Sequence, residues 1–117
     1  MILSDSELVE MLREPRTRRE GFAVLVKQYS EKLYWKVRRI VLSHEDANDV
    51  LQNVFIKVWS NLQNFQGKSS LSTWLYRIAV NESLDFLRKQ KLADKVSTDE
   101  DDSVASRLMS DEYFDGD

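Results

Sequence analysis

Hydroxyl and amide side chains gather in the short polar segment from Gln66 to Ser70, directly before a long segment with helical periodicity. Such groups form hydrogen bonds readily and suit phosphates and the exposed edges of bases. The polar and basic residues of the loop and of the other helix faces are Lys68, Ser69, Ser70, Arg77, Asn81, Arg88 and Lys89. Composition alone favours an alternative, an ordinary surface helix with a Ser/Thr N-cap, because most charged helix faces are merely solvated.

A second candidate surface lies on the segment Asp46–Leu62, which carries two stripes at helical spacing. The apolar stripe, expected to face the core, is Ala47, Val50, Leu51, Val54, Phe55, Val58 and Leu62. The mixed stripe is Asn48, Asp49, Gln52, Asn53, Ile56 and Trp59. Large apolar groups beside carboxylate and amide groups are typical of an interface rather than a solvated face. The alternative is that Trp59 folds into the core.

The sequence contains no catalytic or metal-binding constellation. It has no cysteine, and its single histidine leaves little scope for histidine catalysis or for zinc. His44, Glu45 and the nearby Asp46 and Asp49 are too close together to converge on a metal without a special loop, and acidic residues at a helix start are explained by the helix dipole. With only three glycines there is no Gly-rich phosphate loop. We therefore expect a protein that is not an enzyme and that binds no metal and no cofactor.

Charge is divided unevenly along the 117 residues, whose net charge is -3. The segment from Asp94 to Asp117 holds nine acidic and two basic residues, a net charge of -7, which leaves +4 for the rest. A mildly basic body is compatible with a nucleic-acid partner despite an overall pI near 5.2. No apolar run reaches the roughly 18 residues that span a bilayer, and the acidic N-terminus lacks a signal-peptide pattern. We expect a soluble cytoplasmic protein without membrane insertion.

Apolar residues at three- and four-residue spacing predict four helices. Their expected ranges are Asp5–Arg13, capped by Ser4 or Asp5 and ended by Pro15; about Arg18–Leu42; Asp46–Leu62; and a helix capped by Ser70 or Ser72 that ends near Lys91. Aromatics at helical spacing usually pack in the core, which we expect of Tyr34 and Trp35, although stacking on nucleotides is the alternative.

The predicted fold is therefore all-α, a compact domain of three long helices plus a short N-terminal helix. Past Leu92 the composition shifts to Asp, Ser and Glu, which is typical of a flexible acidic linker or tail. We expect one folded domain over residues 1–92 and the acidic segment over residues 93–117.

Three runs of residues give a more specific indication. They are Asp46–Trp59 (DANDVLQNVFIKVW), Phe65–Gly67 (FQG) and Thr73–Asn81 (TWLYRIAVN). In this order they closely resemble the second conserved region of bacterial RNA polymerase sigma factors, and they are most similar to the small extracytoplasmic-function (ECF) group. The resemblance extends over roughly Leu8 to Lys91, and a pattern of this length is far more specific than a short motif.

The resemblance implies a bacterial transcription initiation factor. In the family this domain docks on the coiled-coil clamp helices of the polymerase β′ subunit, recognises the promoter −10 element and holds the melted non-template single strand. By resemblance, core RNA polymerase binds the mixed stripe, namely Asn48, Asp49, Gln52, Asn53, Ile56 and Trp59. By the same resemblance, DNA binds Lys68, Ser69, Ser70, Ser72, Thr73, Arg77, Asn81 and Arg88. The Gln66–Thr73 loop would capture a flipped −10 base, and an anti-sigma factor would mask the same surfaces.

The sequence departs from the family pattern at a few positions. Asn53 stands where many relatives carry Glu, Leu71 where Phe is frequent, and Gln66 where Arg or a similar residue is common. These changes would alter the clamp contact, the loop's hold on phosphates and the preferred −10 bases. Trp74 matches an aromatic that helps to open the duplex in some relatives, but here we expect it to pack into the core.

The resemblance leaves one rival function. Family members usually carry a second helical domain that reads the −35 element, and the residues after Leu92 resemble the linker to it. The rival is a sigma-like protein-interaction module that binds polymerase or an anti-sigma factor without reading DNA. It would be favoured if the acidic tail folded back on the Arg77–Lys91 face as a DNA mimic. Strand binding through several phosphates should weaken steeply with salt, and this separates the two.

Overall fold

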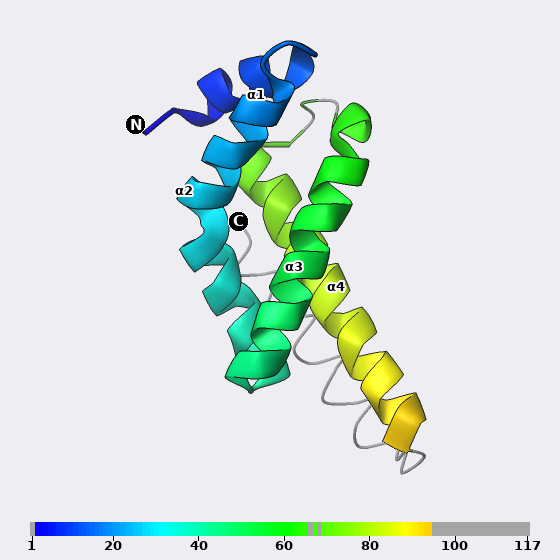
Figure 1. The fold of residues 1–117 in the computed structure, drawn as a ribbon. Coiled ribbons are helices and arrows are strands. Elements are labelled where there is room, and N and C mark those ends of the chain that lie inside the picture. Colours follow the sequence, from blue (N-terminus) through cyan, green and yellow to red (C-terminus); the bar gives the residue numbers. More distant parts are fainter. Residues whose placement is uncertain (1, 66, 68, 95–117) are drawn as a thin grey trace.

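The computed structural model describes residues 2–65, 67 and 69–94, and within these ranges every regular element is helical. In chain order the elements are α1 (Asp5–Arg13), α2 (Arg18–Val41), α3 (His44–Ser60), the short 3₁₀ helix η1 (Leu62–Asn64) and α4 (Leu71–Asp94). Figure 1 shows α2, α3 and α4 alternating in direction beside one another, with α1 lying across the end where α2 begins. The predicted all-α fold is confirmed. The acidic segment 93–117 lies almost wholly outside the described residues, so the boundary at residue 92 stays a prediction.

Helix α1 begins with a reciprocal pair of hydrogen bonds. The Glu7 backbone N–H donates to Ser4 Oγ at 3.2 Å, while the Ser4 backbone N–H donates to the Glu7 carboxylate at 2.9 Å. This capping box satisfies two backbone donors that the first turn leaves without partners. Ser4 is therefore the cap. The helix buries Leu8 and Leu12 against the rest of the domain.

Helices α1 and α2 approach each other closely at a glycine. A Cβ atom at Gly21 would lie 2.8 Å from the Cβ of Met11, closer than side-chain atoms normally approach. The Tyr29 hydroxyl donates to the Asp5 carboxylate at 2.7 Å, which ties the start of α1 to the middle of α2. These contacts hold α1 along the first half of α2.

The turn between α2 and α3 combines a left-handed C-cap with a serine N-cap. Leu42 adopts a left-handed conformation with φ of 64°, and its N–H donates to the Arg38 carbonyl at 3.2 Å. Ser43 Oγ then accepts from the Asp46 N–H at 3.1 Å and caps α3. Because Ser43 is the cap, α3 begins at His44, two residues earlier than predicted, and ends at Ser60.

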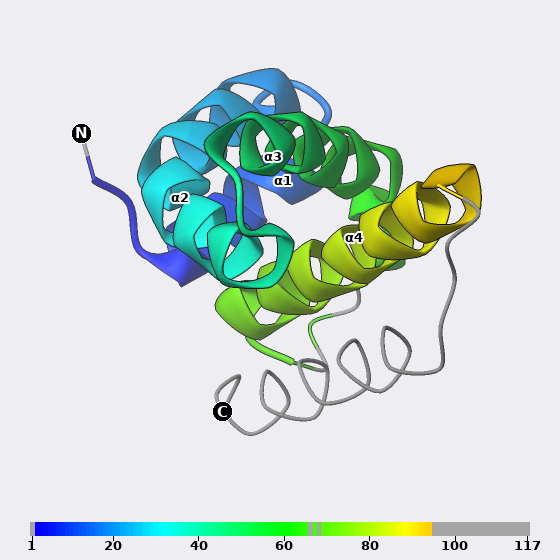
Figure 2. The same cartoon turned by 90° about the horizontal axis from the view of Figure 1, so that it is seen from below.

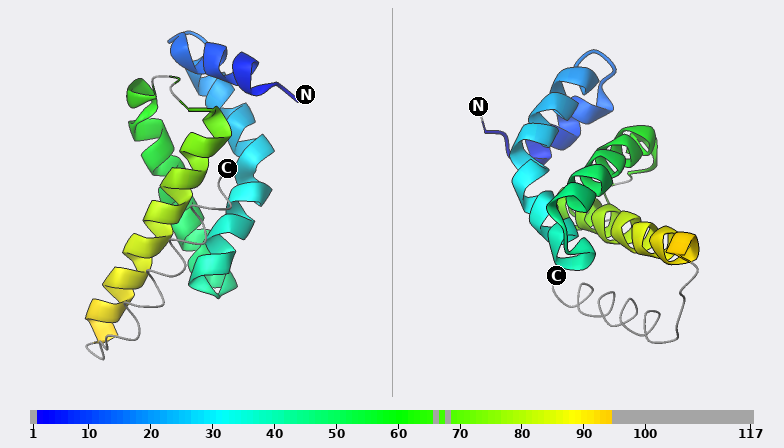
Figure 3. Two further views of the ribbon diagram at one scale, coloured as in Figure 1. Left: turned by 180° about the vertical axis from the view of Figure 1, so that it is seen from behind. Right: turned by 60° about the horizontal axis from the view of Figure 1, so that its bottom comes forward.

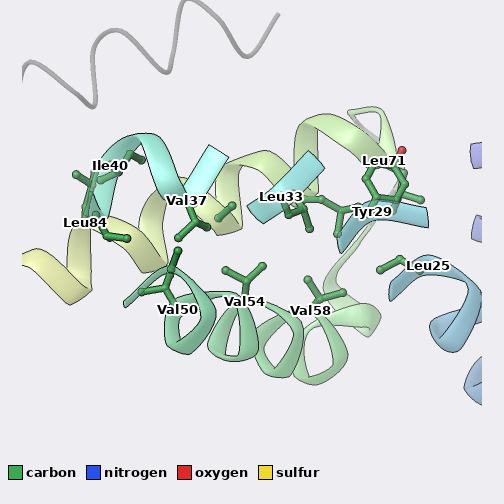
Figure 4. Packing of buried hydrophobic residues seen from close by; sticks show 14 of the residues in the cluster. Leu25, Tyr29, Leu33, Val37, Ile40, Val50, Val54, Val58, Leu71 and Leu84 are labelled. Atoms are coloured by element: carbon green, nitrogen blue, oxygen red, sulfur yellow. The ribbon is translucent and has the colours of Figure 1, made fainter. Parts of the chain in front are cut away.

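The core lies between the three long helices, which surround it in the view of Figure 2. In Figure 4, Val50, Val54 and Val58 of α3 point toward Leu33 and Val37 of α2. Helix α4 adds Leu71, Leu75, Ala79 and Leu84 to the buried set. Beyond this core, α4 extends past the ends of its neighbours (Figure 3).

One buried residue is polar. Ser83 is fully buried on α4, and its hydroxyl donates to the Ala79 carbonyl at 2.7 Å. A serine that bonds the carbonyl four residues back satisfies its own polar group, so it can pack like a small apolar side chain.

The expectation that Trp35 packs in the core is wrong, because its side chain is 55% exposed. Leu33 and Val37 fix the buried face of α2, and a residue two positions after Leu33 points about 200° around the helix from it. Trp35 instead packs edge-on against the half-buried Tyr34, with the ring centres 4.9 Å apart.

Candidate functional site

The mixed stripe of α3 is open to solvent. Its six residues, Asn48, Asp49, Gln52, Asn53, Ile56 and Trp59, are all exposed, and we call them the α3 stripe. The two large apolar side chains are 63% exposed at Ile56 and 44% exposed at Trp59. Trp59 therefore does not fold into the core. Because exposed apolar groups of this size flanked by polar ones mark interaction surfaces, the stripe is suited to binding another macromolecule.

Trp59 is held in place by an aromatic residue of α2. The Phe22 ring lies 5.0 Å from the Trp59 ring at an interplanar angle of 64°, and it also meets Phe55 edge-on at 6.4 Å. Edge-to-face contacts of this kind fix the orientation of a large side chain before any partner arrives. Phe22 is not among the site residues predicted from the sequence, so its supporting role is a finding of the structure.

A chain of hydrogen bonds fixes the other end of the α3 stripe. Asn48 Nδ2 lies 3.1 Å from His44 Nε2, and His44 Nδ1 lies 2.7 Å from the Tyr34 hydroxyl. The histidine is thus occupied by neighbouring polar side chains. In the described part of the chain, no group of three His, Cys, Asp or Glu residues is arranged to hold a metal ion.

The loop before α4 is organised around the hydroxyl of Ser70. Ser70 Oγ accepts from the Thr73 N–H at 3.1 Å and lies 2.9 Å from Thr73 Oγ1 and 3.2 Å from Ser72 Oγ. Ser70, rather than Ser72, therefore caps the helix. Ser70 is exposed, whereas Ser69 and Thr73 are half-buried. Lys68, another predicted DNA-binding residue, lies outside the described residues.

Ser72 differs from the other predicted loop residues because it lies beside the phenol of Tyr29. Burial, and then the hydrogen bond to the Asp5 carboxylate, raise the pKa of the Tyr29 phenol, so the hydroxyl remains protonated. Ser72 therefore lies where the start of α4 meets α2.

A hollow of about 290 Å³ opens beside this loop. Its lining residues are Val9, Leu12, Arg13, Arg18, Leu62, Gln63, Phe65, Leu71 and Trp74. Phe65 and Trp74 form one wall, with ring centres 5.0 Å apart and an interplanar angle of 47°. Trp74 is half-buried and packs against the core, as predicted. Gly67 has φ of 74°, a left-handed conformation that favours glycine, and it turns the loop at this point.

The predicted basic residues of α4 are strung along the helix rather than clustered. Arg77 and Asn81 are exposed one turn apart, and Arg88 follows about 16 Å beyond Arg77 along the axis. Arg88 Nη1 lies 2.7 Å from the Asp85 carboxylate, so part of its charge is already balanced. Arg77 makes no ion pair with any residue in the described ranges, which leaves it the more available cation.

A second hollow, of about 390 Å³, lies between α3 and α4. Asn81 and Arg88 line it together with Lys57, whose ammonium group lies 3.9 Å from the Glu82 carboxylate. Mixed charge of this kind suits a polar ligand better than an apolar one. No helix within the described residues is both long and apolar enough to cross a membrane.

Comparison with known proteins finds a family match whose residues include both candidate surfaces. Residues 25–93 match the Sigma-70 region 2 family, a range that contains α3, the loop and almost all of α4. This chain belongs to the sigma-70 family. Sigma factors are transcription initiation factors and not enzymes, as the sequence predicts for this chain.

Named relatives place the sigma-70 domain more finely. It is 37% identical over 115 residues to the RNA polymerase sigma-H factor of Pseudomonas aeruginosa, a match that covers 97% of this chain and 54% of that protein. It is 42% identical over 88 residues to the ECF RNA polymerase sigma-E factor of Escherichia coli K12, covering 75% of this chain and 44% of that protein. The chain thus spans about half the length of these relatives. The resemblance to the ECF group is confirmed.

A solved structure supports the same assignment. The NMR structure of an engineered region 2 of sigmaE in complex with GTAAAA superimposes with a TM-score of 0.69 and 35% sequence identity. The match covers 82% of this chain and 96% of that one. The helical arrangement seen in Figure 1 is therefore the sigma-70 region 2 fold.

Proposed function

We propose that this sigma-70 region 2 domain acts in transcription initiation, where it binds core RNA polymerase and recognises the promoter −10 element. The observation that carries the proposal is the α3 stripe. Two large apolar side chains stay exposed there, within the part of the chain that matches region 2. A factor with these partners would act in the cytoplasm, and an anti-sigma factor would be expected to cover the same surfaces.

The α3 stripe would dock on the clamp helices of the β′ subunit. Ile56 and Trp59 supply exposed apolar area, while Asp49 and Gln52 supply polar contacts about one to three turns earlier on the same face. Interfaces commonly combine an apolar centre that includes tryptophan with a polar rim. Because Phe22 already orients Trp59, little side-chain freedom would be lost on docking.

The loop and the adjacent hollow would hold the non-template strand and one flipped base. Ser70 and Thr73 offer hydroxyls to the Watson–Crick edge of such a base, and Phe65 and Trp74 offer aromatic surface beside them. Extruding a base costs a few kcal/mol, so capture is favoured once pairing has loosened. The complex of the engineered sigmaE region 2 with GTAAAA supports strand binding at this surface, because that domain has the same fold.

Helix α4 would continue the DNA surface upstream. Arg77 and Asn81 are exposed immediately after the loop and would face the duplex, whereas Arg88 would have to exchange its Asp85 partner for a phosphate. Such an exchange replaces one charge-assisted contact by another, so Arg88 should contribute less to affinity than Arg77.

Binding of fluorescein-labelled single-stranded GTAAAA, followed by anisotropy at several salt concentrations, tests the DNA half of the proposal. Wild-type affinity should fall with salt, with a slope of about -0.7 in log K per phosphate contact. Arg77→Ala and Asn81→Ala should weaken binding while the chain still binds polymerase. Arg39→Ala is the matched control, because Arg39 is an exposed arginine at the far end of α2. Strand binding that is absent or independent of salt would favour the rival, a module that binds proteins only.

A further inference from the structure

The last residue of α1 brings a positive charge to the loop of the proposed strand-binding surface. A Cβ atom at Gly67 would lie 3.6 Å from Arg13 Nη2, so the guanidinium lies against the loop backbone. Figure 1 shows the α1–α2 turn and the α3–α4 connection at the same end of the molecule. Helix α1 precedes residues 25–93, the part that matches region 2, so the family match gives Arg13 no role.

Arg13 also lines the hollow beside the loop, together with apolar and aromatic residues. The hollow is bounded by Arg13 and Arg18 on the α1–α2 side and by Phe65, Leu71 and Trp74 on the loop and α4 side. A hollow lined by cationic side chains together with apolar and aromatic ones fits a nucleotide, whose phosphate is anionic and whose base has an apolar face.

The two arginines that line the hollow have different roles. Arg18 donates from Nε to the Leu12 carbonyl at 2.8 Å and from Nη2 to the Arg13 carbonyl at 3.1 Å, which satisfies the open carbonyls at the end of α1. Arg18 is thus part of the fold. The Arg13 side chain is exposed and makes no ion pair with any described residue, so its charge is available.

The helix dipole alone does not explain this arrangement. A basic residue in the last turn of α1 stabilises the helix through its dipole, and this effect needs no contact with another segment. It does not require the guanidinium to lie against a loop that is distant in sequence. Arg13 would need only to remain in solvent to meet that electrostatic role.

We propose that Arg13 binds a phosphate of the DNA strand that the loop holds, so that the strand passes between α1 and the loop. The inference rests on the proposed function, because it adds a residue to the same strand-binding surface. A guanidinium can contact two phosphate oxygens at once, which would fix the strand's path across the hollow.

Anisotropy titrations of labelled GTAAAA with Arg13→Gln and with Arg39→Gln test the proposal. Glutamine keeps helix propensity and removes one charge, so both variants should fold, which thermal unfolding checks. Loss of one single-strand phosphate contact should lower affinity about 8-fold at about 50 mM salt and about 3-fold at about 200 mM salt, and should reduce the salt slope by about 0.7. Arg39→Gln should leave both quantities unchanged. Arg13→Lys should retain the salt slope.

The outcomes separate this inference from the function on which it rests. Equal effects of Arg13→Gln and Arg39→Gln would reveal a general charge effect and overturn the proposal. If wild type binds and Arg77→Ala weakens binding while Arg13→Gln does not, the inference fails and the proposed function stands. If the wild-type chain shows no salt-dependent strand binding, both fail.

Discussion

Replacing Trp59 by alanine should remove a large part of the apolar contact that the α3 stripe offers to polymerase. A tryptophan side chain buries up to about 250 Å², and 44% of that area, about 110 Å², is still exposed here. At about 25 cal/mol per Å², covering this area would contribute about 2.8 kcal/mol to binding. The Trp59→Ala variant should therefore bind core polymerase up to about 100-fold more weakly.

The same substitution should leave the chain folded. It removes one edge-to-face contact with Phe22, which is worth about 0.5–1.5 kcal/mol, and it opens no cavity in the centre of the core. Thermal unfolding followed by circular dichroism measures this loss separately. Binding can be measured with core polymerase of Escherichia coli, whose sigma-E factor is 42% identical to this chain over 88 residues.

Trp35→Ala is the matched control for this prediction. Trp35 is 55% exposed, more than Trp59, but it lies on α2 outside the α3 stripe. If exposed area alone decided binding, Trp35→Ala would be the more damaging change. We expect it to leave polymerase affinity unchanged. Equal losses in the two variants, or no loss in Trp59→Ala, would refute the assignment of the stripe.

Two further predictions concern stability. Gly21→Ala should lower the free energy of unfolding by about 1–3 kcal/mol, because the Cβ of the new alanine would lie 2.8 Å from the Cβ of Met11. A thermal unfolding midpoint equal to that of wild type would contradict this, because it would show that α1 and α2 can separate without loss of stability. Backbone and side-chain hydrogen bonds with Ser4 lower the pKa of Glu7 below 4.5. The ionised Glu7 carboxylate therefore adds to the free energy of unfolding above pH 4.5, and this stabilisation is lost as the pH falls through the folded-state pKa. The stability difference between wild type and Glu7→Gln should therefore shrink between about pH 6 and about pH 3, and a constant difference would contradict this reasoning.

The helices could be predicted from the sequence because their signals are local. Ser4 and Pro15 lie next to the ends that they define, and the apolar stripes fix which face of each helix is buried. The predicted start of α3 lies two residues too late because Ser43 caps the helix, and only the backbone geometry shows this.

The exposure of the tryptophans was harder to predict. Trp35 and Trp59 both lie at helical spacing beside apolar residues, yet each has a large exposed fraction. What decides this is the angle around the helix relative to the core, together with the presence of a supporting ring such as Phe22. Amino-acid composition gives neither the angle around the helix nor the presence of a supporting ring. Ser83 shows the converse, since a polar residue is buried because its own helix accepts its hydrogen bond.

Contacts between distant segments could not be predicted at all. Helical periodicity shows which residues share a face, but it does not show which helix covers them. Tyr29 pairs with Asp5, and Arg13 lies against the loop at Gly67, because α1 lies across the end of the domain where that loop runs. Nothing in the sequence marked Arg13, at the end of the first helix, as a candidate site residue, and the fold brings it to the candidate site.

Co-purification of the chain with core RNA polymerase, with wild type beside the Asp49→Ala/Gln52→Ala double variant, tests the central claim most directly. Both side chains are exposed on α3 and outside the buried set, so the double variant should keep its helicity. The account predicts that wild type is retained with polymerase and that the folded double variant is not. Equal retention of the two, or retention of neither, would contradict it.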